Sequence, residues 1–236
     1  MKRQKIIRTI ICVLLVFPIV GLLALLVMQI KEPVDFNKHT AYRESVAIQR
    51  LKDVRDLQVA YKNVNGRYAS TIDSLKLFYN EGKMKVVMRV GSKDDSLAMA
   101  NTDRYKKKFS NLKGEALNQK LHQIYLSGER NLVFSITTEV AVKDTLFRTR
   151  EDFNVDDLAI IPFSGGDSLI MESTIKTVSG VKVPLFEASM PYKSLLKGLK
   201  NQLIVNLNAK REDQGRYKGL QVGSIVTPNN NAGNWE

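Results

Sequence analysis

The 236-residue chain has few of the residues that catalytic and metal sites require. It contains one cysteine, Cys12, and two histidines, His39 and His122. One cysteine cannot form a disulfide within the chain, so stability has to come from the hydrophobic core. Neither histidine belongs to a His-x-x-x-His or His-Glu-x-x-His pattern. We therefore predict no zinc site and no metal cofactor.

Motifs for nucleophilic catalysis and phosphate binding are also missing. The chain has no Gly-x-Ser-x-Gly turn, no Gly-x-x-x-x-Gly-Lys-Ser/Thr loop and no Gly-x-Gly-x-x-Gly after a strand. Asp94-Asp95 and Asp156-Asp157 are adjacent pairs, and neighbouring strand residues point to opposite faces, so neither pair is a carboxylate dyad by itself. We predict a protein without cofactor or enzymatic activity. The alternative is an anchored hydrolase in which distant carboxylates meet.

Acidic residues are absent before Glu32, and this gap coincides with an apolar run over residues 6–30 whose one charge is Arg8. About 20 apolar residues cross a hydrocarbon core of about 30 Å, and only a helix satisfies its backbone there as a single segment. A cleaved signal peptide has an apolar run of about 7–15 residues and an Ala-x-Ala-like site, and neither is present. We therefore predict an uncleaved transmembrane helix.

Basic residues are concentrated before this helix, at Lys2, Arg3, Lys5 and Arg8. Such a bias favours a cytoplasmic N-terminus. The predicted organisation is a cytoplasmic basic tip (1–5), a helix across the bacterial inner membrane (6–30) and a periplasmic remainder. That remainder divides into an amphipathic helix with a cap helix (31–80), an α+β domain (81–226) and a flexible polar tail (227–236).

The exported part is basic, because removing the four N-terminal cations from a formal net charge of +12 leaves about +8. Its densest cluster is a candidate basic patch of Arg104, Lys106, Lys107 and Lys108. Positive charge favours anionic neighbours, here lipid head groups or anionic envelope polymers. Nearby aromatic residues could also mimic a surface for single-stranded nucleic acid. At helical spacing they fit a core better, so nucleic acid is not the favoured partner.

Residues 38–64 predict a second stretch of helix, with one apolar stripe against a charged face. Pro33 predicts a bend between this stretch and the transmembrane run. We take the middle of the stripe as a candidate surface for pairing with protein partners: Leu51, Val54, Leu57 and Tyr61.

The stripe ends in the motif Leu57-Gln-Val-Ala-Tyr61-Lys-Asn-Val-Asn65-Gly66-Arg-Tyr68, and Asp73-Ser-Leu75 follows. With the apolar helix before it, this motif resembles type IV pilins and type II secretion pseudopilins over residues 6–80. In those families an anchor helix runs into an exported amphipathic helix, which leads to an antiparallel sheet. Those families also carry a glycine cleavage site and a glutamate that this chain lacks around Lys5 and Ile6. The resemblance implies a related architecture.

The remaining patterns predict a mainly antiparallel sheet with short helices, hence an α+β fold. The predicted helices are 70–81, 103–126, divided at Gly114, and 191–199. The predicted strands are 84–90, 132–142, 157–163, 169–176, 181–188, 202–210 and 220–226, with a hairpin turn at Ser179-Gly180 and an edge position at Pro184. Trp235, the only tryptophan, is a candidate docking residue in the tail.

The leading functional hypothesis is a single-pass envelope protein that acts as a scaffold or as an assembly subunit of a pilin-like or secretion machine. It rests on the predicted anchor, the amphipathic stripe and the missing catalytic motifs. Two alternatives stay open: the anchored hydrolase, and a basic, DNA-handling pilin-like component.

Overall fold

The computed structural model describes residues 2–236, and it describes side chains from residue 14 onward except at positions 15, 16, 23 and 24. The side chains of the predicted basic tip and of Cys12 lie outside this description. The chain forms two compact units, which we describe separately. The anchor unit comprises Met1–Asp56 and Asp156–Glu236, and the basic unit comprises Leu57–Val155.

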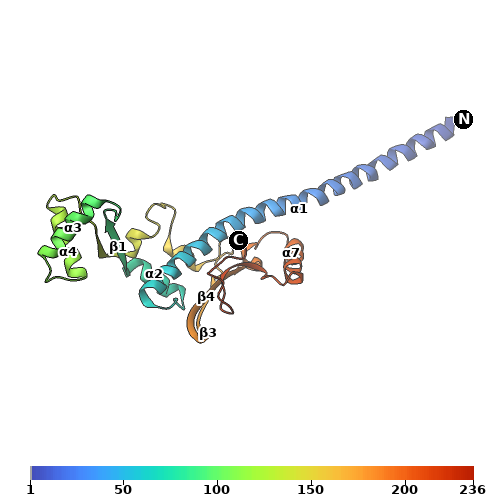
Figure 1. Ribbon diagram of the computed structural model, residues 1–236. Helices are drawn as coiled ribbons and strands as arrows, with labels where there is room; N and C mark the ends of the chain where they lie inside the picture. The colour runs from blue at the N-terminus through green and yellow to red at the C-terminus, as the bar shows by residue number, and fades with distance from the viewer. Residues whose placement is uncertain (1) are drawn as a thin grey trace. The chain divides into compact units, whose positions relative to one another are not determined.

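Helix α1 (Lys2–Asn65) is a single helix that carries both predicted helical stretches (Figure 1). It continues through Pro18 and Pro33, so the two stretches are not separated at Pro33. The part from Phe17 onward is long and apolar enough to cross a membrane. The helix ends as the sequence predicts: Gly66 has a φ of +72° and its N–H donates to the Lys62 carbonyl at 2.8 Å.

The anchor unit contains an antiparallel sheet in the order β3-β4-β5, and Figure 1 labels its strands β3 and β4. The strands are β3 (Ile170–Val178), β4 (Val181–Pro191) and β5 (Gly219–Gly223). The predicted hairpin is confirmed, and Ser179 and Gly180 both have positive φ, as a tight two-residue turn requires. Pro184 pairs with Ile175 of β3 and lies outside the 187–191 stretch of β4 that pairs with β5, which explains its tolerance in a central strand.

Two strand predictions in the anchor unit are wrong. Residues 157–163 contain a 3₁₀ turn, η1 (Val155–Ala159), and the isolated bridge of Ile160 with Ser168. Leu158 and Ile161 are both buried, and their spacing of three fits a tight helical turn rather than a strand. Residues 202–210 lie in helix α7 (Asn201–Asp213), which follows the one-turn helix α6 (Tyr192–Leu195).

The error at α7 has a simple cause. Leu203, Val205 and Leu207 recur at every second position, as on one face of a strand, but Val205 is 50% exposed. The buried apolar residue is Ile204, which lies between them. Short apolar runs are ambiguous between helix and strand, and the Gln, Ala, Lys and Arg residues of this segment favour helix.

The basic unit is built on two antiparallel strands with short helices. Its elements are α2 (Ile72–Glu81), β1 (Lys83–Val90), α3 (Ser96–Lys108), α4 (Glu115–Leu126), β2 (Phe134–Ala141) and α5 (Val142–Thr145). The two strands pair along their full length. Gly114, with a φ of +59°, separates α3 from α4 as predicted. Leu121, Leu132 and Phe134 form the core between α4 and β2.

Residues 227–236, predicted as a flexible polar tail, return to β5. The Gly223 N–H donates to the Ala232 carbonyl at 3.0 Å, and the Asn234 N–H donates to the Gln221 carbonyl at 2.9 Å. Trp235, the candidate docking residue, is half-buried here. The fold class is the predicted one: a long N-terminal apolar helix followed by short helices and antiparallel sheets.

Candidate functional site

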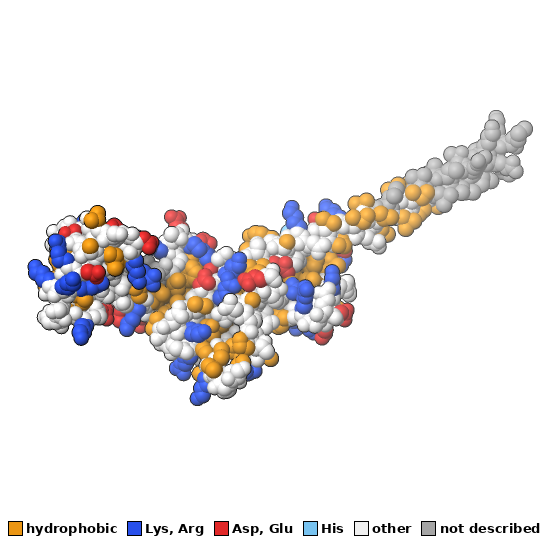
Figure 2. All heavy atoms as spheres, in the orientation of Figure 1, with side chains coloured by type: hydrophobic (Ala, Val, Ile, Leu, Met, Phe, Trp, Pro, Cys, Tyr) orange, Lys and Arg blue, Asp and Glu red, His pale blue; other side chains and the backbone are white. Residues whose placement is uncertain are grey.

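The described side chains of α1 between Leu14 and Ile30 are mostly apolar and are exposed on every side of the helix. Ten large apolar side chains between Leu14 and Ile30 are each 54–74% exposed. Leu25, Leu26, Val27 and Met28 are consecutive, and successive helix residues are turned by about 100°, so together they cover the whole circumference. Figure 2 shows these side chains in succession along the coloured part of the helix. A surface that is apolar all round suits lipid rather than a groove on one partner.

The second half of α1 exposes its polar side and buries one apolar face. Between Ala47 and Ala60 the buried apolar residues recur at spacings of three and four: Ala47, Leu51, Val54, Leu57 and Ala60. Asp53 and Gln58 are buried beside them. Three members of the predicted pairing surface therefore lie in the protein's own interior. Tyr61, the fourth, is half-buried with its ring 5.2 Å from the Phe78 ring. These three side chains are therefore not available as a surface for another protein.

Glu44 of α1 is joined to the C-terminal part of the anchor unit through a buried tyrosine. The Tyr192 hydroxyl donates to the Glu44 carboxylate, and Arg211 of α7 donates to the same hydroxyl oxygen at 2.5 Å. The Arg211 guanidinium also lies over the Tyr192 ring, 5.2 Å from its centroid. Burial raises the pKa of Tyr192, and its bond to Glu44 raises it further. The phenol therefore remains protonated, as a donor to Glu44, at physiological pH.

A second set of polar contacts joins α1 to the segment between α6 and α7. We call residues 196–200 the α6–α7 turn. The Lys200 ammonium donates to the Glu32 carboxylate. Arg43 donates to the carbonyls of Leu195 at 3.1 Å and Lys197 at 2.9 Å. These contacts join the C-terminal part of the anchor unit to α1 at two levels, at Glu32 directly after the apolar run and at Arg43 about three helix turns further on.

The basic unit carries much of the positive charge. Residues 83–130 hold eleven Lys or Arg residues and five Asp or Glu residues, a net charge of +6. The candidate basic patch lies at the end of α3, where Arg104, Lys106, Lys107 and Lys108 are all exposed. Lys106 forms an ion pair with Asp103 at 3.1 Å, and Arg104 donates to the Asn101 side chain at 2.6 Å.

The aromatic residues near this patch have cations over their rings. Arg104 lies over Tyr105, Lys108 and Lys120 lie over Phe109, and Arg130 lies over Tyr125, with centroid distances of 4.5–5.9 Å. Tyr105 and Tyr125 also pack against the core cluster of the unit. Base stacking requires an open ring face. The arrangement thus supplies positive charge without an obvious stacking platform.

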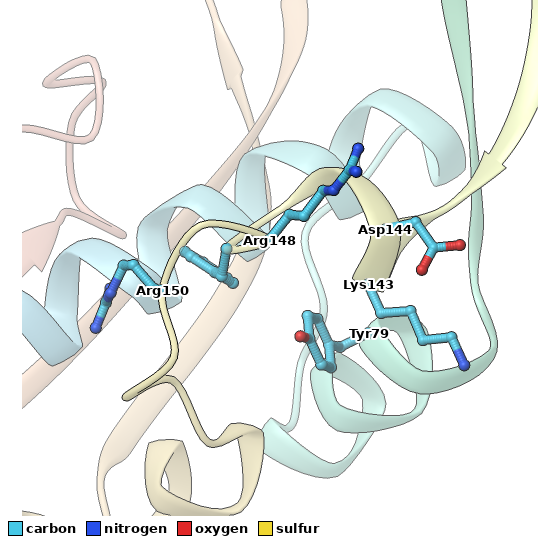
Figure 3. Close-up of a pocket in the computed structure, with 6 residues that line it drawn as sticks. Tyr79, Lys143, Asp144, Arg148 and Arg150 are labelled. Atoms are coloured by element: carbon cyan, nitrogen blue, oxygen red, sulfur yellow. The ribbon is translucent and has the colours of Figure 1, made fainter.

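A shallow cavity of about 590 Å³ lies in the basic unit beside α2 and α5. It is lined by Tyr79, Lys143, Asp144, Phe147, Arg148 and Arg150. Figure 3 shows Lys143, Arg148 and Arg150 extending in different directions rather than toward one point. Arg150 also pairs with Asp152 at 3.4 Å and lies over the Phe147 and Phe153 rings. The cations therefore do not assemble a site for one anion.

The described residues contain no group of three His, Cys, Asp or Glu side chains that could hold a metal ion. His39 is exposed, and His122 is half-buried with its ring 5.9 Å from that of Phe134. The two histidines lie in different units, so the structure gives no reason to combine them.

The chain matches no family model, no curated protein and no solved structure. The resemblance of residues 6–80 to pilins and pseudopilins therefore stays an expectation from the sequence.

Proposed function

We propose that this protein is a single-pass membrane protein of the bacterial envelope whose exported α+β part is a non-enzymatic scaffold or assembly subunit. Pilin-like and secretion machines are the class of assembly that fits best. One observation carries the proposal: α1 is a single helix whose described side chains between Leu14 and Ile30 are apolar and uncovered on all sides, and which contributes Ala47, Leu51, Val54, Leu57 and Ala60 to the core.

The continuity of α1 supports a positioning role. A flexible linker between anchor and domain would let the domain move independently of the membrane. Here the apolar run continues without a break into the part of α1 that belongs to the core of the anchor unit. Residues 31–56 extend by roughly 40 Å along the helix axis. The anchor unit would therefore be presented at a fixed distance from the bilayer, as an assembly subunit requires.

The orientation in this proposal comes from charge. Four basic residues precede the apolar run and no acidic residue does, which favours an N-terminus in the cytoplasm and a periplasmic domain. Single cysteines test this orientation in a Cys12→Ala background, which has no native thiol. We expect a membrane-impermeant maleimide to label Ser110→Cys in cells with a permeabilised outer membrane. Gln4→Cys should be labelled only after lysis. The reverse pattern would invert the proposed topology.

Membrane attachment and assembly are tested on the full-length chain. We expect the protein to stay with membranes after alkaline carbonate extraction, and release into the supernatant would contradict the anchor. Chemical crosslinking in cells, followed by native electrophoresis in mild detergent, should give a discrete species larger than the monomer. A strictly monomeric protein with no crosslinked partner would contradict the assembly role while leaving the anchor intact.

A further inference from the structure

The contact between Lys200 and Glu32 places part of the anchor unit at the level of the membrane surface. Glu32 lies two residues after the apolar run, which corresponds to about 3 Å along the helix axis. The head-group layer adds roughly 5–8 Å on each side of the hydrocarbon core. If α1 crosses the bilayer over residues 6–30, Lys200 therefore lies within the layer of lipid head groups.

We infer that the Lys200 end of the α6–α7 turn rests on the outer surface of the bilayer, where the Lys200 ammonium contacts the phosphate groups of lipid heads. This inference rests on the proposed function, because it requires the anchor to be inserted. The protein would then meet the membrane twice, through α1 and through this turn.

The chemistry of the turn suits such a contact. Lys197 and Lys200 are exposed, and Lys31 is exposed on the adjacent part of α1. Glu32 and Asp167 offset part of this charge, with Lys197 lying 3.6 Å from Asp167. An ion pair at the surface leaves further donors on each ammonium group, and these can bond phosphate oxygens.

The two ends of α7 are fixed at different heights along α1. Lys200 precedes α7 and contacts Glu32, whereas Arg211 near its end reaches Glu44 through Tyr192. Glu32 and Glu44 are 12 residues apart, which is about 18 Å of helix. The start of α7 should therefore be close to lipid and its end well clear of it. This difference provides a matched pair of probe sites.

The experiment compares Gln202→Cys with Gln214→Cys, both exposed glutamines, in the full-length Cys12→Ala chain. Each is labelled with an environment-sensitive fluorophore and reconstituted into vesicles of phosphatidylcholine and phosphatidylglycerol that carry a nitroxide on the lipid head group. We expect strong quenching at residue 202 and little at residue 214. Equal quenching at both sites, or none at either, would overturn the inference.

A second arm tests Lys200. Lys200→Gln should reduce the quenching at residue 202, whereas Lys210→Gln, at an exposed lysine near the other end of α7, should leave it unchanged. Undiminished quenching in Lys200→Gln would overturn the role of this lysine. Carbonate extraction of the same samples separates the hypotheses: protein lost from the vesicles contradicts the anchor, and protein retained but unquenched contradicts only the docked turn.

Discussion

The two halves of α1 are both rich in apolar residues, but these residues differ in how much of their surface is buried. Between Leu14 and Ile30 the large apolar side chains stay more than half exposed around the whole helix. From Ala47 to Ala60 the buried residues follow one face, and Leu51, Val54 and Leu57 have no exposed surface. The arrangement of apolar residues, rather than their number, distinguishes a helix made for lipid from one made for a protein core.

The strongest way to break this comparison is to put charge into the first half. Phe17→Arg combined with Val20→Arg places two cations near the middle of the apolar run. Each costs roughly 3 kcal/mol at the centre of a membrane helix. We expect the variant to lose carbonate-resistant membrane attachment. Val34→Arg, at an equally exposed position outside the run, should remain attached. Full retention of the double variant would show that this half is not a membrane span.

The second half is tested by removing a buried side chain. Leu51→Ala should destabilise the anchor unit by about 2–5 kcal/mol, because a fully buried leucine leaves a cavity when it is truncated. Leu25→Ala, on the same helix but 58% exposed, is the matched control and should leave the unfolding of the domain unchanged. Thermal unfolding in detergent, followed by near-ultraviolet circular dichroism, measures both. Equal effects would mean that the two halves are covered alike.

This result also bears on the candidate pairing surface. Because Leu51 is fully buried, a Leu51→Asp substitution would unfold the protein rather than separate two partners. The sequence predicts the apolar stripe correctly from its spacing. Spacing alone cannot say whether the stripe packs against the rest of its own chain or against another subunit, since both bury the same face.

A substitution at the junction between α1 and the C-terminal part of the anchor unit should lower stability less than Leu51→Ala does. Tyr192→Phe removes the hydroxyl that joins Glu44 to Arg211, and hydrogen bonds to charged groups contribute about 1.5–3 kcal/mol. We expect a loss of about that size at neutral pH. Tyr42→Phe, at a tyrosine that is 62% exposed, should cost much less. An unchanged stability in Tyr192→Phe would contradict a structural role for this contact.

The same tyrosine predicts a dependence on pH. Because burial and Glu44 raise the pKa of Tyr192 in the fold, the unfolded chain ionises first, near its ordinary value of 10.0. The stabilisation is complete below that pH and is lost as the pH rises toward the folded value. The free energy of unfolding, measured with a chemical denaturant, should therefore fall more above pH 10 for wild type than for Tyr192→Phe. Parallel curves would show that the phenol does not carry this dependence.

The sequence could not predict this junction, although it predicted most local structure. Helix ends at Asn65-Gly66 and Gly114 and the hairpin at Ser179-Gly180 follow from a few adjacent residues. Tyr192 and Glu44 are 148 positions apart, and neither lies in a recognisable motif. Their meeting depends on how residues 192–200 pack against α1, which local patterns do not encode. The same limit explains why the pairing of residues 227–236 with β5 was not predicted. That pairing uses backbone hydrogen bonds, which produce no recognisable pattern of side chains in a polar segment.

The smallest effect is expected where α1 meets the C-terminus. Arg55 donates to the Glu236 side chain at 2.7 Å, and this bond lowers the pKa of Glu236. The contribution is present above the ordinary pKa of 4.5 and is lost as the pH falls through the folded value. Because the pair is exposed, solvent screens it, and Glu236→Gln should not shift global unfolding.

Glu236→Gln should instead loosen the neighbouring Trp235, so that acrylamide quenches the Trp235 fluorescence more strongly. Glu212→Gln, which breaks the exposed pair with Lys218, should leave that fluorescence unchanged. If Trp235 is already fully accessible to acrylamide in wild type, the C-terminal segment is the flexible tail that its composition predicts. Residues 227–236 then do not cover α1 at Arg55.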